Sequence, residues 1–275
     1  MTGFFDDQQW FVVKEMSEGI FAIAEPLHAE HVRSYLVVGA ERGVLIDTGT
    51  GIGDIRSVVD RLTSLSVSVI NSHSHWDHIG GNWRFDQIAI HPAEARWLDD
   101  PGNTIALQAS STEDQLRGAL PPGVTWEGLC IPPSQPTSFL HGGEQLDLGG
   151  VTLEVIHAPG HAPGLLAFLD RERDLLLSTD VVYPGPLYAY GADVNLEDYL
   201  DSLAMLSRLA PTLKTILPCH CGDSMPPEMI PVMRDALASV MAGRLPETAD
   251  EEKVTHHFDG FAIYAPLELA GQASP

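Results

Sequence analysis

Short apolar runs separated by glycine-containing turns open the chain and predict β-strands. These runs cover residues 10–16, 20–25, 34–39 and 44–47. Their length and their bounding turns, such as Ser17-Glu18-Gly19, are typical of strands. A helix is predicted after Gly53, because apolar residues then recur at helical spacing at Ile55, Val58, Val59 and Leu62.

The alternation of strands and helices continues along the chain. Further strands are predicted at residues 67–71, 87–90, 145–148, 151–157, 165–169, 174–178 and 215–217, and a last strand through Phe258 and Ile263. Helices are predicted to open at Pro92, at Asn195 as N-cap, and between Pro226 and Ala242 with Gly243 as C-cap. Two β-rich halves that each end in helices predict an α+β protein with two sheets packed face to face and helices outside.

Residues 99–141 differ in composition from the rest of the chain. They hold six prolines and only one helix-like run, at 104–119. Such a segment is too long for a plain connector. We interpret it as an active-site cover within a single domain that spans residues 1–275.

Composition and charge narrow the class of partner. The net charge is −23, from 15 basic and 38 acidic residues, which gives no electrostatic footprint for nucleic acid or an anionic membrane. No window reaches the length of a membrane span, and the start MTGFFDDQQW lacks the layout of a signal peptide. Three cysteines form no disulfide framework. We therefore expect a cytoplasmic protein whose partner is a small molecule and neither nucleic acid nor a membrane, and leave a homodimer open.

The run His73-Ser74-His75-Trp76-Asp77-His78 carries the most chemical information. If the chain stays extended after residue 71, His73 and His75 point the same way, and a turn brings Asp77 and His78 to a neighbouring side. Imidazole nitrogens and carboxylate oxygens are the ligands that borderline-soft divalent metals favour. The run therefore predicts most of a metal centre.

Three distant residues complete the candidate set. His161 follows Pro159-Gly160, Asp180 follows Ser178-Thr179, and His220 follows Pro218-Cys219. Each stands on a loop directly after a predicted strand, where a rigid sheet aims the side chain. Seven ligand-type residues in this order make a chance grouping a poor explanation.

At these residues the sequence resembles the metallo-β-lactamase superfamily over nearly its whole length. The segments Asp47-Thr48-Gly49, His-x-His-x-Asp-His, Pro-Gly-His161, Ser-Thr-Asp180 and Pro-Cys-His220 occur in the family's order. The resemblance implies the four-layer αββα sandwich. It also implies that His73, His75 and His161 hold one metal ion, that Asp77, His78 and His220 hold a second, and that Asp180 bridges both.

The resemblance implies two divalent metal ions, zinc foremost, with iron or manganese as alternatives. Such a pair implies hydrolysis of an ester-type carbonyl by a metal-bridging hydroxide. A bridging aspartate is a feature in which the sequence resembles the glyoxalase II, lactonase and thioesterase branches. We therefore rank thioesters and lactones above β-lactams as expected substrates. Mono-iron persulfide dioxygenases share the motif and remain an alternative. Asp77 is placed to pass a proton to the leaving group.

Tyr183 is the second candidate catalytic residue. It matches the position at which lactonases of this superfamily carry a tyrosine that donates to the developing oxyanion. The alternative is an aromatic residue that only packs in its loop. The segment around it, with Arg84-Phe85-Asp86 and 91–95, also resembles a branch that contains acyl-CoA thioesterases.

Some residues near the motifs have other expected roles. Cys219 departs from the family, which commonly has glycine before the last ligand. We expect His157 to orient the His161 loop by a hydrogen bond. We expect His28 and His31 to be exposed in a loop.

Overall fold

The computed structural model describes residues 4–6 and 9–270. Residues 1–3 and 7–8 belong to the N-terminal stretch in which we expect no signal peptide, and they lie outside the described residues, as do residues 271–275. The chain divides into two compact units, Met1–Val155 and Ile156–Pro275. The expectation of one domain over residues 1–275 stays a prediction.

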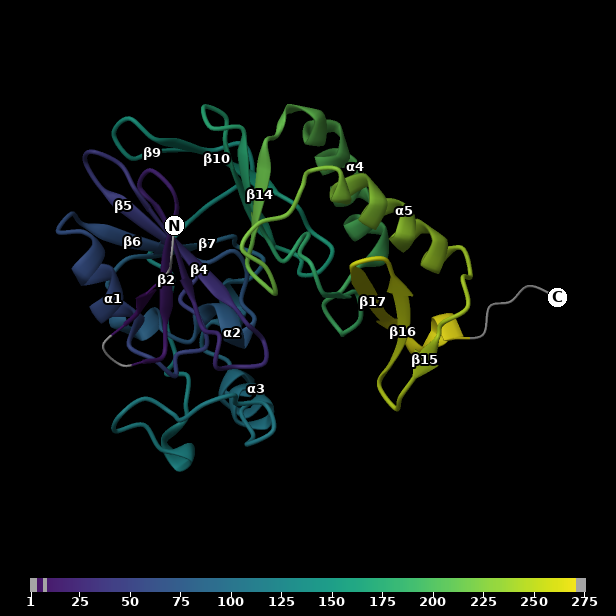
Figure 1. Cartoon of the computed structure of the whole chain (residues 1–275), viewed down its shortest axis with the longest axis horizontal. Helices are drawn as coiled ribbons and strands as arrows, with labels where there is room; N and C mark the ends of the chain where they lie inside the picture. The colour runs from purple at the N-terminus through teal and green to yellow at the C-terminus, as the bar shows by residue number, and fades with distance from the viewer. Residues whose placement is uncertain (1–3, 7–8, 271–275) are drawn as a thin grey trace. The chain divides into compact units, whose positions relative to one another are not determined.

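The first unit is built on an eight-stranded sheet in the order β1-β2-β3-β4-β5-β6-β7-β8, drawn in purple to teal in Figure 1. Its strands are β1 (Phe4–Phe5), β2 (Val12–Ser17), β3 (Ile20–Ala24), β4 (Arg33–Val38), β5 (Gly43–Ile46), β6 (Val67–Ile70), β7 (Ile88–Ile90) and β8 (Ser138–Phe139). Pairing is antiparallel from β1 to β5 and parallel from β5 to β8. The parallel strands therefore run in one direction and end at one edge of the sheet.

Three helices accompany this sheet: α1 (Ile55–Leu62), α2 (Trp76–Ile79) and α3 (Gly102–Ser110). The helix α1 forms as predicted, with the Asp54 side chain accepting from the Ser57 backbone amide at its N-terminus. It buries Ile55, Val58 and Val59 in a core shared with residues of the sheet. A hairpin of β9 (Gln145–Asp147) and the first residues of β10 (Thr152–His157) closes the unit.

Two helix predictions in this unit are wrong. After Pro92 the chain makes only a single 3₁₀ turn, Ala95–Trp97. The run at 104–119 is helical only to Ser110. Beyond it the backbone pairs with an earlier loop instead: the Arg117 amide donates to the Leu27 carbonyl at 2.8 Å. These tertiary hydrogen bonds replace those that a longer helix would have made. The segment then rejoins the sheet through β8, and its role as a cover stays a prediction.

His28 is buried, with 0% of its surface exposed, contrary to the expected exposure. The residue 99–141 segment covers it, and its Nε2 atom lies 3.3 Å from the Ser111 hydroxyl. Its Nδ1 atom accepts from the Glu30 amide at 3.2 Å. Nδ1 therefore carries a lone pair, and the ring is held in its neutral form.

This burial predicts a pH-dependent stability. Burial is the main cause that lowers the pKa of His28 from 6.5 to about 4. The unfolded chain therefore binds an extra proton between these pH values, and stability falls as pH drops from 6.5 to 4. We expect His28 to account for a loss of about 2 kcal/mol in the free energy of unfolding between pH 7 and pH 5. Urea unfolding of the wild type and of His28→Gln at both pH values measures it. If the difference in free energy of unfolding between the wild type and His28→Gln were the same at pH 7 and pH 5, the lowered pKa of His28 would be contradicted.

The second unit begins within β10, a strand of the five-stranded sheet β14-β12-β11-β10-β9. The strands are β11 (Leu166–Asp170), β12 (Leu175–Thr179) and β14 (Thr215–Pro218). The strand β12 pairs antiparallel with β11 and parallel with β14. Every residue of β11 and β12 is buried, as their continuous apolar runs indicate.

Two helices of this unit, α4 (Leu196–Leu209) and α5 (Met229–Met241), pack against each other and are drawn in green in Figure 1. The Asn195 side chain accepts from the amides of Glu197 and Asp198, so the predicted N-cap is confirmed. The helix α5 ends with Ala242 as its C-cap, one residue before the predicted Gly243. Gly243 follows with φ of 96°, the left-handed conformation that ends many helices.

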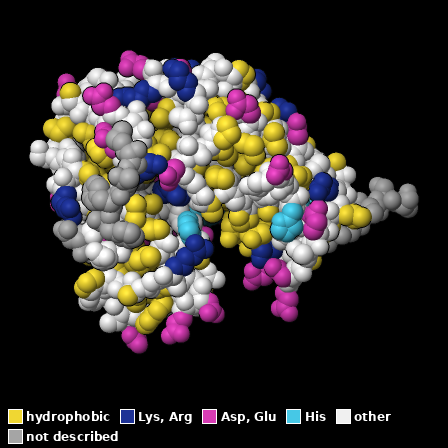
Figure 2. Space-filling model, in the orientation of Figure 1, with side chains coloured by type: hydrophobic (Ala, Val, Ile, Leu, Met, Phe, Trp, Pro, Cys, Tyr) yellow, Lys and Arg dark blue, Asp and Glu magenta, His cyan; other side chains and the backbone are white. Residues whose placement is uncertain are grey.

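A small sheet in the order β13-β17-β16-β15 completes the unit. Its strands are β13 (Pro186–Tyr188), β15 (Thr248–Ala249), β16 (Lys253–Phe258) and β17 (Phe261–Pro266). The single closing strand predicted through Phe258 and Ile263 is instead the hairpin β16–β17. Figure 2 shows acidic side chains at the tip between β15 and β16, where residues 250–252 are exposed.

Candidate functional site

In the first unit, the ends of two parallel strands bring ligand-type residues to one edge of the sheet. Ile46, the last residue of β5, pairs with Ile70, the last residue of β6. The residues that follow these strands therefore leave the sheet side by side. Asp47 follows β5, and its carboxylate accepts from the Ser72 amide and hydroxyl after β6, each at 2.7 Å.

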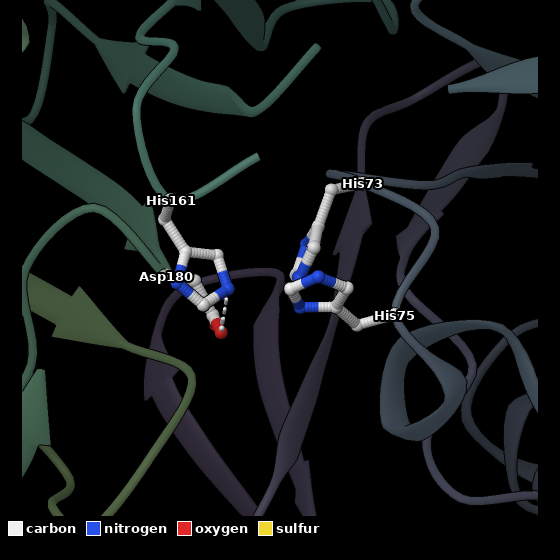
Figure 3. A group of neighbouring side chains, drawn as sticks. All are labelled: His73, His75, His161 and Asp180. Carbon is white, nitrogen blue, oxygen red and sulfur yellow. Dashed lines mark ion pairs between the residues drawn. The ribbon is translucent and has the colours of Figure 1, made fainter. Parts of the chain in front are cut away.

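The four predicted ligands of this unit lie close together. The rings of His73 and His75 are 4.4 Å apart between centroids, and they stand next to each other in Figure 3. The rings of His73 and His78 are 4.3 Å apart. Asp77 and His78 belong to the short helix α2, and Asp77 Oδ2 lies 3.5 Å from His78 Nε2. The helix α2 thus places His78 beside His73, as the predicted turn requires.

Hydrogen bonds set the tautomer of two of these histidines. His78 Nδ1 lies 2.8 Å from Asp47 Oδ2, a carboxylate oxygen that only accepts. The Ser72 hydroxyl donates to the same carboxylate, so it accepts from His73 Nδ1 at 2.9 Å. In the neutral form, both imidazoles therefore carry their proton on Nδ1 and a lone pair on Nε2. This is the form in which histidine binds a metal, with its other nitrogen held by a supporting acceptor.

The second unit repeats this construction. Leu177 of β12 pairs with Leu217 of β14, and Thr179 pairs with Pro218 after an irregularity in register. Asp180 follows the first strand and His220 the second, so both leave the sheet at one edge. His220 Nε2 lies 3.4 Å from Asp180 Oδ1.

His161 reaches the other oxygen of the same carboxylate. Its Nε2 atom is 3.3 Å from Asp180 Oδ2, the contact that Figure 3 marks with a dashed line. Its Nδ1 atom donates to the Tyr188 carbonyl at 2.9 Å. In the neutral ring Nε2 therefore carries a lone pair and faces an oxygen that also accepts. An imidazole nitrogen and a carboxylate oxygen at this separation are a donor pair that fits a divalent metal.

The backbone around these ligands is tightly constrained. Gly160 has φ of 138°, and a Cβ atom there would lie 2.2 Å from the Cα of Tyr199. The Tyr199 hydroxyl donates to the Val181 carbonyl at 2.9 Å, next to Asp180. Thr179, which precedes Asp180, has φ of 48°, a strained conformation for a residue with a side chain. The loops of His161 and Asp180 are therefore held by α4.

The structure also places two residues with predicted supporting or catalytic roles. His157 Nε2 lies 3.0 Å from the Pro163 carbonyl, which confirms the predicted hydrogen bond to the His161 loop. Tyr183 is 2% exposed, and its ring lies 5.2 Å from that of His220. Its hydroxyl accepts from the Tyr188 amide at 3.1 Å. Burial raises the pKa of Tyr183 well above 10, so its hydroxyl stays protonated at neutral pH.

Sequence reasoning missed several supporting residues. Asp47 ends a predicted strand and begins the segment Asp47-Thr48-Gly49, but no role was predicted for it. It orients His78 and, through Ser72, His73. Glu94 lies in the segment 91–95 but had no predicted role. It is fully buried and accepts at 3.1 Å from the amide of Ser74, which stands between His73 and His75. The available signal was that an acidic residue follows, or comes shortly after, each of the parallel strands β5 and β7.

The comparisons with known proteins settle the family. A family model described as the metallo-beta-lactamase superfamily matches residues 29–220, more than half of the 275 residues. The chain belongs to the metallo-β-lactamase superfamily. The resemblance inferred from the motifs and the expected α+β fold are thereby confirmed. The match takes in all seven predicted ligands, which stand in both compact units.

Several superfamily members are similar over most of this chain. An acyl-coenzyme A thioesterase from Gallus gallus is 33% identical over 230 residues, which cover 77% of this chain and 81% of that protein. The acyl-coenzyme A thioesterase from Homo sapiens is 30% identical over 228 residues, with the same coverage of 77% and 81%. This superfamily member is thus a relative of thioesterases.

Solved structures of the superfamily share the fold. A metallo-beta-lactamase family protein from Thermus thermophilus has a TM-score of 0.61 and 21% identity, covering 83% of this chain and 82% of its own. A metallo-beta-lactamase from Pontibacter korlensis has a TM-score of 0.62 and 17% identity, covering 83% and 99%. Among the described residues, this superfamily member has no helix with the length and hydropathy of a membrane span.

Proposed function

We propose that this superfamily member is a binuclear metal hydrolase that cleaves acyl thioesters, with acyl-CoA as the substrate class. The observation that carries the proposal is the similarity to acyl-coenzyme A thioesterases, 30 to 33% identical over 77% of this chain. The match spans 81% of those relatives, so it includes most of their length. Lactones are the alternative ester-type substrate, because Tyr183 occupies the position of the lactonase tyrosine.

The proposed metal ligands are the seven residues taken from the superfamily motifs. We assign His73, His75 and His161 to the first ion, Asp77, His78 and His220 to the second, and Asp180 to both. Zinc is the proposed metal, with iron and manganese as alternatives. One similar protein, 25% identical with a TM-score of 0.55, was solved in a di-iron-bound form. When bound, such a pair of ions lowers the pKa of a water molecule and polarises a carbonyl oxygen.

The other residues supply position and protons. Asp47, Ser72 and the Tyr188 carbonyl keep three ligand histidines in the tautomer that presents Nε2. Asp77 is 7% exposed, and its carboxyl group is proposed to pass a proton to the departing sulfur. The leaving thiolate is then released as a neutral thiol.

A substrate panel tests the proposal. Zinc-loaded protein is assayed with acyl-CoA, the matching acyl-glutathione, an acyl-homoserine lactone and a cephalosporin. We expect the highest kcat/KM for acyl-CoA. An acyl-CoA rate at or below the lactone rate would replace the thioesterase proposal by the lactonase alternative.

The metal content is a separate prediction. Two complete ligand sets require close to two transition-metal ions per chain, which elemental analysis of the purified protein measures. Dialysis against a chelator is expected to abolish hydrolysis, and added zinc to restore it. One tightly held iron, together with sulfite production from glutathione persulfide, would instead establish the dioxygenase alternative.

Tyr183→Phe tests the second catalytic assignment. The phenyl ring keeps the packing in the buried cluster and removes one hydroxyl donor. If that hydroxyl donates to the oxyanion, kcat falls by roughly 10- to 1000-fold with little change in KM. Steady-state kinetics on the best substrate measure it. An unchanged kcat would show that Tyr183 only packs and accepts from Tyr188.

A further inference from the structure

A buried thiol lies against the proposed bridging carboxylate. Cys219 is 1% exposed, and its Sγ atom is 2.5 Å from Asp180 Oδ1. The same oxygen lies 3.4 Å from His220 Nε2. One carboxylate oxygen is therefore shared by a thiol and an imidazole, and the ligand atoms of the three residues all lie within 4.8 Å of one another.

The sheet makes this grouping rigid. Cys219 and His220 follow β14, and Asp180 follows β12, its parallel neighbour. The pairing of Thr179 with Pro218 places the two loops at the same level of the sheet. The other two cysteines differ: Cys130 and Cys221 are exposed.

We propose that Cys219 is an additional ligand of the metal ion held by Asp180 and His220, and that it makes this site selective for thiophilic ions. The proposal rests on the metal centre of the proposed function and not on its substrate. Thiolate, imidazole and carboxylate are together a typical ligand set for zinc. A thiolate selects zinc or cobalt over manganese, which prefers oxygen ligands.

Binding of the metal ion exchanges the hydrogen bond of Cys219 for a bond to the ion. The Cys219 thiol gives up its hydrogen bond to Asp180 and loses one proton to the solvent. Its sulfur lone pair then forms the bond to the divalent ion, and no electron is transferred. Donors around a zinc ion lie roughly 3 to 4 Å apart, given bond lengths of about 2.0 to 2.3 Å. The present separations need to change by about 1 Å or less to meet that geometry.

A different arrangement would leave Cys219 as a neutral thiol that only donates to Asp180. In that case the residue positions the carboxylate and has no bond to the metal. Metal affinity alone does not separate the two arrangements, since both support the site. A spectroscopic signature of a sulfur–metal bond distinguishes a metal-bound thiolate from a thiol that only donates to Asp180.

Cobalt substitution provides that signature. The metal-free protein is reconstituted with Co²⁺, and its near-ultraviolet thiolate-to-cobalt charge-transfer absorption is recorded together with the visible cobalt bands. We expect the charge-transfer band in the wild type and its loss in Cys219→Ser, while the visible bands show that cobalt remains bound. Cys221→Ser is the matched control, because it removes the cysteine on the other side of His220, and it is expected to keep the band.

A second variant and a competition assay make the test independent of one substitution. Cys219→Gly restores the residue that the superfamily commonly has, and it should also lack the band. In both Cys219 variants the preference for zinc over manganese should fall by at least about tenfold. A wild-type protein that binds cobalt without the band, or a band that persists in Cys219→Ser, overturns the proposal.

The outcomes also separate this inference from the proposed function. A charge-transfer band in a protein that does not hydrolyse acyl-CoA leaves Cys219 as a ligand and overturns only the substrate assignment. Thioesterase activity without the band overturns only the role of Cys219. Failure of the wild type to bind cobalt or zinc overturns the metal centre and this inference with it.

Discussion

Replacing His220 by alanine is expected to lower the rate of acyl-CoA hydrolysis by more than about 100-fold. This loss exceeds that expected when a residue that only supports a metal ligand is removed. His73→Ala is expected to have a similar effect through the other proposed ion. Each substitution removes one imidazole from a different ligand set. Steady-state kinetics at saturating metal, with metal content measured in parallel, test the expectation.

Matched controls are available in each unit. His141→Ala and His257→Ala remove exposed histidines outside the ligand set and are expected to leave kcat/KM within about twofold. Circular dichroism establishes whether each variant is folded. Full turnover by folded His220→Ala would rule out the two-metal mechanism.

Asp47→Ala is expected to cost both stability and metal binding. The Asp47 carboxylate is 1% exposed and accepts from the Ser72 amide and hydroxyl and from His78 Nδ1. Its removal leaves these donors buried without their acceptor, which costs about 3 to 5 kcal/mol in the free energy of unfolding. Metal affinity should fall by about 10- to 100-fold, because His73 and His78 lose their orientation.

Two comparisons identify the cause of that loss. Asp60→Ala removes an exposed aspartate paired with Arg56 and should change stability by less than about 0.5 kcal/mol. Ser72→Ala removes one hydroxyl of the network and should cost about 1 to 2 kcal/mol. Urea unfolding and zinc titration give both quantities. An Asp47→Ala variant as stable as Asp60→Ala would contradict the role assigned to the carboxylate.

The sequence alone determined where most strands lie and which residues are candidate ligands. Apolar runs such as residues 20–25 and 215–217 are bounded by turns. The turn residues on either side set where each strand begins and ends. The run from His73 to His78 needs only a strand end and a tight turn to bring its ligands together. The Asn195 N-cap is likewise a local signal, because its side chain caps amides two and three residues away.

Where distant segments compete for backbone hydrogen bonds, the sequence pattern was insufficient. The helix after residue 104 stops at Ser110 because residues beyond it pair with Leu27 and Ala29. His28 is likewise buried by a segment more than 80 residues away. No local window contains the partners that decided these two cases. The hairpin β16–β17 is different: it turns at Asp259-Gly260, a local signal that sequence reasoning missed.

The tertiary structure decided how the ligands are held. Asp47 contacts His78 across 31 residues, Tyr188 contacts His161 across 27, and Cys219 contacts Asp180 across 39. Residue types and spacing indicate that histidines and aspartates stand after strands. Which nitrogen carries the proton, and which thiol reaches a carboxylate, depends on strands that become neighbours only when the sheets form, because hydrogen bonds act over about 3 Å and not along the chain.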